Sequence, residues 1–115
     1  MSDPRPITVA DARAVELGPD PIDPELIVSG SPVASAADIA EGRSGAVTGV
    51  WRIEPGVVTD TEVEETFVVL EGRATIEHDG ESYELRPGSV CVFAAGAETK
   101  WTVHETLLKV YVIAG

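Results

Sequence analysis

Glu65 is the residue whose type and position could most readily do chemistry in this chain. It opens the apolar run ETFVVL (65–70), and because side chains on a strand alternate with period two, it would share a face with Phe67 and Val69. The other face is also largely apolar, so we expect this strand to be covered on both sides. A carboxylate at its start lies either at a rim or in a pocket. From the residues alone the rim is favoured, because an unpaired buried acid is costly.

A second charged residue, Lys109, interrupts the apolar run LLKVYVI (107–113) and shares a strand face with Tyr111. Fully buried lysines are rare unless they are paired. If this face points inward, Lys109 could pair with Glu65 and hold both groups charged. If it points outward, Lys109 is an edge-strand charge that discourages aggregation. The sequence leaves both alternatives open.

Other reactive side chains add little. His78 adjoins a predicted tight turn and His104 lies near a strand end, positions that favour surface or hydrogen-bonding roles over metal ligation. Cys91 lies in the apolar run VCVF, where a buried structural thiol is favoured over a nucleophile. We find no Gly-rich phosphate loop, nucleophile elbow or paired-cysteine zinc pattern.

Short β-strands must position these groups. From residue 46 onward the segments are rich in β-branched or aromatic residues and are separated by turn residues. The predicted strands are AVTGVWRI (46–53), VEETFVVL (63–70), RATIEHD (73–79), ESYELR (81–86), SVCVFAA (89–95), KWTVHE (100–105) and LLKVYVI (107–113). Asp79-Gly80 is a strong hairpin signal, because glycine tolerates positive φ. Strands of this length and spacing predict an all-β sandwich or small barrel.

The chain before residue 25 is expected to be irregular, since its prolines remove backbone donors and restrict the residues that precede them. A short strand is predicted at 25–32, and residues 34–41 are expected to make one helical turn capped by Ser35. We therefore divide the chain into a Pro-rich N-terminal segment, residues 1–24, and a single domain, residues 25–115.

Composition excludes several classes of function. The chain has 115 residues, of which 43% are hydrophobic, enough for one domain that closes a core without disulfides or metal. Its net charge of −12 argues against a nucleic-acid partner, which requires clustered Lys and Arg. No apolar run approaches membrane-spanning length. The lone Cys91 fits a reducing compartment, so we expect a cytoplasmic protein with no membrane partner.

The spacing of glycines and carboxylates between residues 55 and 101 carries further information. Its anchors are Glu65, Gly72, Pro87-Gly88, Gly96 and Trp101. This spacing resembles the two motifs of the cupin superfamily. Over residues 25–113 the chain is similar to the small cupins that include ureidoglycine aminohydrolases and the ethanolamine-utilisation cupin. The resemblance implies a cupin, RmlC-like jelly-roll β-barrel (a double-stranded β-helix) with Glu65 pointing into the barrel, and the pairing of two barrels into a homodimer.

The same resemblance maps the metal-binding histidines of the family onto Thr59, Thr61 and Thr99, so Glu65 alone remains of the four usual ligands. Threonine hydroxyls are poor ligands for Zn, Fe or Mn. Three acidic neighbours could offer oxygens: Asp60, Glu62 and Glu64. They alternate onto the opposite face if the strand stays regular, and only a bulge would bring Asp60 inward. We predict no metal site and no cofactor; a divalent metal would have to bind without the usual histidines.

These considerations predict a binding pocket inside the barrel. The expected lining residues are Trp51, Thr59, Thr61, Glu65, Thr99, Trp101, Lys109 and Tyr111, whereas Phe67 is expected in the core. The preferred hypothesis is a metal-free cupin that binds a small polar or carboxylated metabolite. One alternative is a hydrolase, lyase or isomerase with Glu65 as general acid or base and Lys109 or Tyr111 stabilising negative charge. Another is a non-catalytic interaction domain whose barrel is a packed core.

Overall fold

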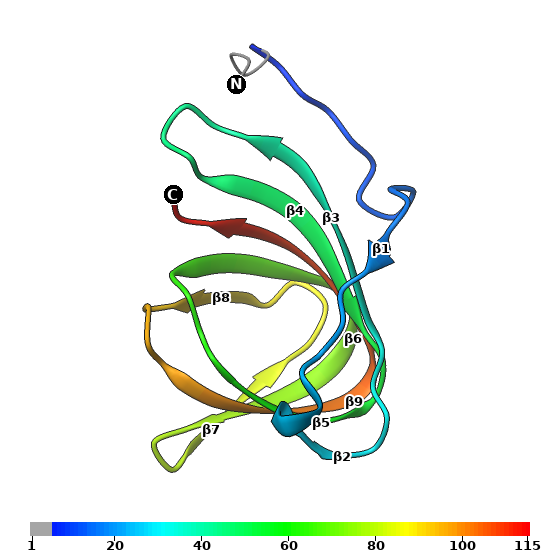
Figure 1. Cartoon of the computed structure of the whole chain (residues 1–115), viewed down its shortest axis with the longest axis vertical. Coiled ribbons are helices and arrows are strands. Elements are labelled where there is room, and N and C mark those ends of the chain that lie inside the picture. The colour runs from blue at the N-terminus through cyan, green and yellow to red at the C-terminus, as the bar shows by residue number, and fades with distance from the viewer. Residues whose placement is uncertain (1–5) are drawn as a thin grey trace.

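A computed structural model describes residues 6–115, and their regular structure is almost entirely β-strand (Figure 1). The strands are β1 (Gly18–Pro19), β2 (Ile27–Ser29), β3 (Ala34–Glu41), β4 (Val47–Ile53), β5 (Gly56–Thr61), β6 (Glu65–His78), β7 (Glu81–Leu85), β8 (Val90–Phe93) and β9 (Glu98–Ile113). A single 3-10 turn, η1 (Pro24–Leu26), precedes β2. Across these residues, no helix is long and apolar enough to traverse a membrane. The predicted all-β fold is confirmed.

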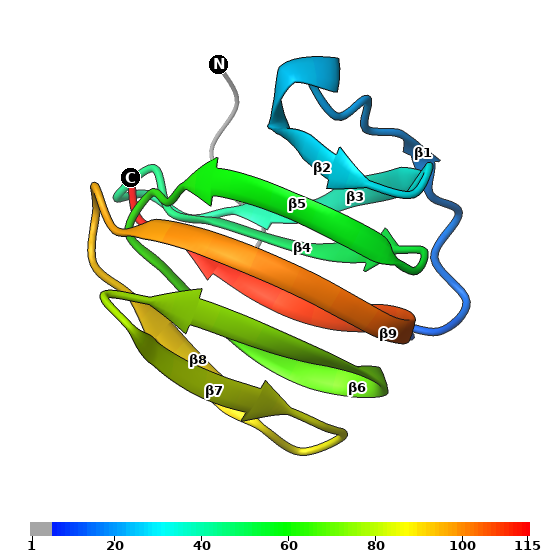
Figure 2. The same cartoon turned by 90° about the horizontal axis from the view of Figure 1, so that it is seen from below.

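The strands form one antiparallel sheet that curls upon itself (Figures 1 and 2). β9 joins β4 and β5 within this sheet, because its residues 107–113 pair with β4 whereas its residues 98–103 pair with β5. β6 runs along the other side of β9 and also pairs with β7 and β8. Figure 2 shows β2, β5, β9, β6 and β7 side by side across one wall. Side chains on the inner face of this curled sheet therefore converge from distant parts of the chain.

β6 and β9 are each a single long strand, although the sequence pattern predicts two shorter strands in each place. Their pairing register shifts between Val69 and Ala74, and Gly72 has a φ of 88° within that stretch. A bulge of this kind bends a strand without ending it. The two strands can therefore turn a corner of the barrel together.

The predicted helical turn at residues 34–41 is wrong. These residues form β3, which pairs with β4 from Ala34↔Ile53 to Glu41↔Val47 and with β1 through Gly18↔Ala36. A single helical turn would leave most of its backbone groups without partners, whereas pairing in the sheet satisfies them. Tertiary pairing has overridden a local preference of alanine-rich sequence for helix.

The hairpin predicted at Asp79-Gly80 is confirmed. It joins β6 to β7 with His78 paired to Glu81, and its two residues have φ of 48° and 78°. Positive φ at both positions is the geometry of a type I′ turn, whose twist matches that of the flanking strands.

The division of the chain into a Pro-rich segment, residues 1–24, and a single domain, residues 25–115, stays a prediction.

The hydrophobic core fills part of the space inside the curled sheet. Its largest fully buried side chains are Phe67, Ile53, Leu107 and Val69. The ring of Phe67 lies 5.6 Å from that of Phe93 and 5.8 Å from that of Trp101, measured between centroids. Aromatic pairs at such distances add to the stability supplied by apolar burial. Trp101, one member of this aromatic group, also lines the cavity that forms the candidate site.

Candidate functional site

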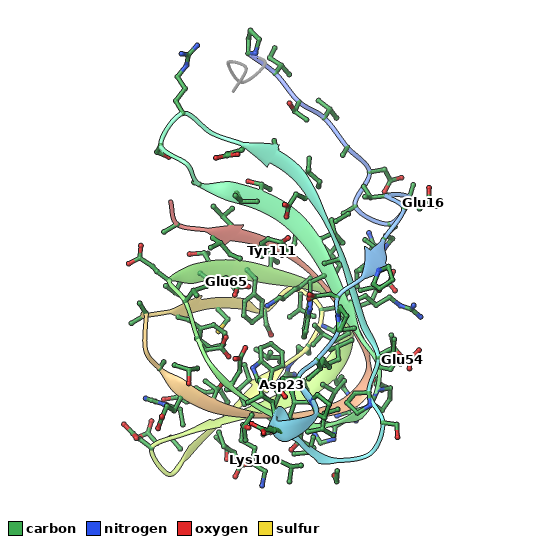
Figure 3. All side chains as sticks on the ribbon, in the orientation of Figure 1. Glu16, Asp23, Glu54, Glu65, Lys100 and Tyr111 are labelled. Atoms are coloured by element: carbon green, nitrogen blue, oxygen red, sulfur yellow. The ribbon has the colours of Figure 1, made fainter. Side chains whose placement is uncertain are left out.

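A cavity of about 630 Å³ lies within the curled sheet. Seven of the eight predicted site residues line it: Trp51, Thr59, Thr61, Glu65, Trp101, Lys109 and Tyr111. In Figure 3, Glu65, Tyr111 and Asp23 lie around this space, whereas Glu16, Glu54 and Lys100 lie on the outside of the sheet. Five strands (β3, β4, β5, β6 and β9), together with η1 and the segment before it, contribute to the lining. The β-sheet thus brings together residues that are up to about ninety positions apart in sequence.

The floor of the cavity holds a buried ion pair between Lys109 and Glu65. Lys109 Nζ lies 2.7 Å from Glu65 Oε2, and both side chains are only 7% exposed. The ammonium also lies 4.2 Å from the ring centroid of Phe67, 4.6 Å from that of Trp51 and 5.2 Å from that of Trp101. A carboxylate and aromatic ring faces are the groups that can replace water around a buried ammonium. Of the two orientations left open for Lys109, the inward one is found.

A second buried carboxylate, Glu62, was not predicted at this site. Its side chain lines the cavity and the residue is 7% exposed. Glu62 Oε2 accepts a hydrogen bond of 2.6 Å from the Thr99 hydroxyl and one of 3.0 Å from the Trp101 indole. Burial raises the pKa of the Glu62 carboxyl, and these two hydrogen bonds oppose that rise. Thr99 therefore acts as a hydrogen-bond donor to Glu62 and does not itself line the cavity.

The prediction that Asp60 and Glu62 face away from the pocket is wrong, because the inner face of β5 is the one that carries Val58. Val58 pairs with the buried Trp101 and Asp60 with the buried Thr99, whereas Thr59 pairs with the exposed Lys100. Glu62 continues this pairing through backbone hydrogen bonds of 2.8 Å with Ala97 and Gly96, in the turn before β9. Period-two alternation therefore places Glu62 on the same inner face as Val58 and Asp60.

Tyr111 and Trp51 hold two further acids at the mouth of the cavity. The Tyr111 hydroxyl donates to Asp38 Oδ1 at 2.9 Å, and the Trp51 indole donates to Asp20 Oδ2 at 3.1 Å. Burial, with a smaller contribution from the Asp38 hydrogen bond, raises the pKa of the Tyr111 phenol. Tyr111 therefore remains a protonated donor. Neither aspartate was predicted, because both come from segments expected to be irregular or helical.

Gly49 makes the contact between Tyr111 and Asp38 possible. It lies on β4, directly between Asp38 on β3 and Tyr111 on β9, so the phenol must pass over it. A Cβ at this position would overlap the Tyr111 hydroxyl and come within 2.6 Å of the Ala37 carbonyl oxygen. The absence of a side chain at residue 49 thus shapes the cavity wall.

We expect Gly49→Ala to lower the free energy of unfolding by about 1–3 kcal/mol through overpacking. Urea denaturation should measure this loss against Gly18→Ala, since a Cβ at Gly18 meets nothing within 4 Å. Equal effects of the two substitutions would contradict the placement of Tyr111 over Gly49.

The three threonines at the mapped histidine positions do not form a common ligand set. The Thr59 hydroxyl donates to the Leu26 carbonyl oxygen at 3.4 Å, Thr61 is exposed at the mouth of the cavity, and the Thr99 hydroxyl donates to Glu62. Among residues 6–115, no three His, Cys, Asp or Glu side chains are grouped so that they could hold a metal ion. Glu65 is already engaged by Lys109. The side chains present therefore do not fit the transition-metal centre that the resemblance implies.

The histidines and the cysteine lie away from this cavity. His78 Nδ1 lies 2.7 Å from the Glu98 carbonyl oxygen, and His104 Nε2 lies 2.8 Å from the Thr75 hydroxyl. Burial raises the pKa of the Cys91 thiol to about 11, so little of it is the reactive thiolate near neutral pH. These side chains have hydrogen-bonding or packing roles.

Comparisons with known proteins agree with this architecture. Residues 41–111 match the family model of the EutQ-like cupin domain. A protein of unknown function from Pseudomonas syringae pv. tomato DC3000 is 27% identical with a TM-score of 0.81, over 89% of this chain and 46% of that one. This chain thus spans about half the length of that protein. None of the curated proteins matches it.

Two further structures extend the likeness. A protein of unknown function from Rhizobium leguminosarum bv. viciae 3841 is 30% identical with a TM-score of 0.60, over 69% of this chain and 80% of that one. A protein assigned as ethanolamine utilization protein Q from Salmonella typhimurium LT2 is 18% identical with a TM-score of 0.72, over 99% of this chain and 97% of that one. At that identity the likeness concerns the fold alone. The expected jelly-roll β fold is confirmed.

Proposed function

Because this chain belongs to the family of EutQ-like cupin domains, we propose that it binds a small polar molecule in the cavity bounded by Glu65, Lys109 and Glu62. The observation that carries this proposal is an open space of about 630 Å³ with buried charged groups at its floor. Ligand sites in proteins commonly have volumes of about 300–1,000 Å³ and combine apolar walls with a few polar groups. An interaction domain whose barrel is a packed core would have no need of such a space.

Apolar and aromatic side chains supply the walls of this site. Ile22, Leu26, Ile53 and Val58 line the cavity together with Trp51 and Trp101. Since ionised groups are rarely retained in a protein interior without a role or a partner, the arrangement supports recognition of a polar group at the floor and an apolar body along the walls. We also propose a cytoplasmic location, because the lone Cys91 fits a reducing compartment, and a homodimer, which the resemblance to the small cupins implies.

A library of metabolites sorted by charge, screened by thermal unfolding, tests the proposal. We expect at least one compound to raise Tm in a saturable way, since a ligand at one hundred times its Kd stabilises the folded state by about 2.7 kcal/mol. Ala36→Phe on β3 should abolish the effect, because Ala36 lines the cavity. Ser35→Phe is the matched control, since Ser35 is adjacent on the same strand and is not a lining residue. Absence of any stabilising compound, or equal losses in both variants, would overturn the proposal.

A hydrolase, lyase or isomerase is the second candidate, and one observation favours Glu62 over Glu65 as its acid or base. Burial raises the pKa of the Glu62 carboxyl, which is the direction that favours a general acid or base, whereas Glu65 is bonded to Lys109. Compounds that bind should be followed by NMR for conversion. Loss of conversion in Glu62→Gln at saturating ligand would support this candidate, and unchanged conversion would contradict it.

A further inference from the structure

We propose that the cavity selects a cationic ligand, one carrying an ammonium, amidinium or guanidinium group. This inference rests on the proposed function and specifies the chemical class of the molecule bound. It follows from which hydrogen-bonding groups of the lining are already used within the protein and which are not.

The side-chain donors around the cavity are already engaged by acceptors of the protein. Five of them donate to protein oxygens at 2.7–3.4 Å: Trp51 to Asp20, Trp101 to Glu62, Tyr111 to Asp38, Thr59 to the Leu26 carbonyl and Lys109 to Glu65. The rest of the Lys109 ammonium is surrounded by aromatic rings. Thr61, exposed at the mouth, is the exception, since its hydroxyl has no hydrogen-bond partner among residues 6–115. A ligand that needs donors would therefore find few.

The unused groups are acceptors. Glu62 and Glu65 each accept hydrogen bonds through Oε2, and Oε1 of each has no donor among the residues that the structure describes. No fully enclosed side-chain N or O atom in this part of the chain lacks a partner, so both Oε1 atoms keep some exposed surface, and both residues line the cavity. A carboxylate oxygen in such a partly desolvated position is best stabilised by a hydrogen bond from a charged donor.

The charge of the lining points to the same class of ligand. Six carboxylates face the cavity: Asp20, Asp23, Asp38, Asp60, Glu62 and Glu65. The cations among the lining residues are limited to Lys109, which is already paired with Glu65. Four of the acids are exposed at the mouth, where they attract cations, and two are buried at the floor, where screening is weak. A carboxylated ligand, which the sequence also allowed, would face repulsion at both levels.

The raised pKa of Glu62 adds a dependence on pH. Cation binding requires the ionised carboxylate, so affinity should fall as pH is lowered through the pKa of Glu62. Because burial raises that pKa, the fall should begin at a higher pH than for an exposed glutamate. The groups that act on Glu62 are Thr99, Trp101, Asp60 and Lys109. Asp60 carries negative charge and opposes ionisation of Glu62, whereas the Lys109 ammonium favours it.

Two sets of charge-matched probes test the inference: benzamidine, benzamide and benzoate, and butylamine, butanol and butyrate. We expect the cation of at least one set to bind saturably by calorimetry, and about tenfold or more tightly than its neutral and anionic counterparts. Its affinity should decrease with added salt. Anionic or neutral probes that bind as tightly as the cations, or cations that do not bind, would overturn the inference. The proposed function survives that result if another compound of the library binds, and fails with it if none does.

Glu62→Gln provides the residue-level test. Glutamine can keep an oxygen toward Thr99 and Trp101, but it presents an amide donor to the cavity where the carboxylate presented an acceptor. We expect about tenfold or greater loss of cation affinity and a flatter pH dependence. Glu64→Gln is the control, because Glu64 is exposed and does not line the cavity. Unchanged affinity in Glu62→Gln would contradict the inference, and if this variant does not fold, the charge preference and salt dependence of the native chain decide.

Discussion

Replacing Lys109 with methionine should lower the free energy of unfolding by about 3–5 kcal/mol, because the substitution leaves Glu65 buried without its partner. Methionine retains the length and apolar character of the lysine stem, so packing against Phe67 and Trp51 changes little. What is lost is the ammonium, which lies 2.7 Å from Glu65 Oε2 in a pair that is only 7% exposed. The stability should be measured by urea denaturation at constant salt.

The double variant Glu65→Gln/Lys109→Met separates the interaction energy of the ion pair from the effects of removing each charge alone. Removing both charges leaves no uncompensated ion, so we expect the double variant to recover most of the stability lost in Lys109→Met. The coupling energy from the double-mutant cycle should then reach several times the ~0–1 kcal/mol typical of exposed pairs.

Lys100→Met on the same strand is the matched control. Lys100 Nζ lies 4.0 Å from Glu77 Oε2, and both side chains are 47% exposed. This substitution should change stability by about 0.5 kcal/mol or less. If Lys109→Met cost no more than Lys100→Met, the ammonium would not be in the buried pair.

The fold could be predicted from the sequence wherever local chemistry dictates it. The Asp79-Gly80 turn needs positive φ at two positions, and the flanking residues alternate as strands do, so the hairpin can be read from a few residues. β3 could not be predicted in this way. Its alanine-rich sequence becomes a strand because β1 and β4 pair with it on both sides. Although β4 was predicted, β1 is only two residues long and has no strand pattern, and residues 34–41 carry no β-branched or aromatic run of their own.

The candidate site could be predicted only in part, for a related reason. Lys109 has two faces available, and the choice depends on Glu65, on the rings of Phe67 and Trp51 from other strands, and on Trp101 from beyond the bend in β9. Glu62 was missed because the sequence does not show which face of residues 57–62 is the inner one. Each face of this segment carries one valine and two polar residues. The choice is made by the pairing of β5 with β9, which places Val58, Asp60 and Glu62 inside.

β6 and β9, which supply Glu65 and Lys109, bend together at Gly72. We expect Gly72→Ala to be among the most destabilising single substitutions in the chain. A Cβ there would overlap the Thr106 carbonyl oxygen and lie 2.6 Å from Leu107 Cα. These are backbone atoms of β9, so the clash cannot be relieved by a side-chain rotation. The φ of 88° adds a conformational cost of about 1–2 kcal/mol for a residue with a side chain.

Gly88→Ala isolates the conformational part of this cost. Gly88 has a φ of 94°, and a Cβ there meets nothing within 4 Å, so we expect a loss near 1–2 kcal/mol. Gly72→Ala should exceed it by about 1–3 kcal/mol from the clash, as measured by urea denaturation. The clash should also reach the cavity, because Leu107 is two residues from Lys109 on β9 and any outward shift there separates the ammonium from Glu65. Equal losses in the two variants would contradict the close approach of β6 and β9. The Gly72→Ala substitution should also be made in the Glu65→Gln/Lys109→Met background. A smaller loss of stability there than in the native background would link the corner to the ion pair.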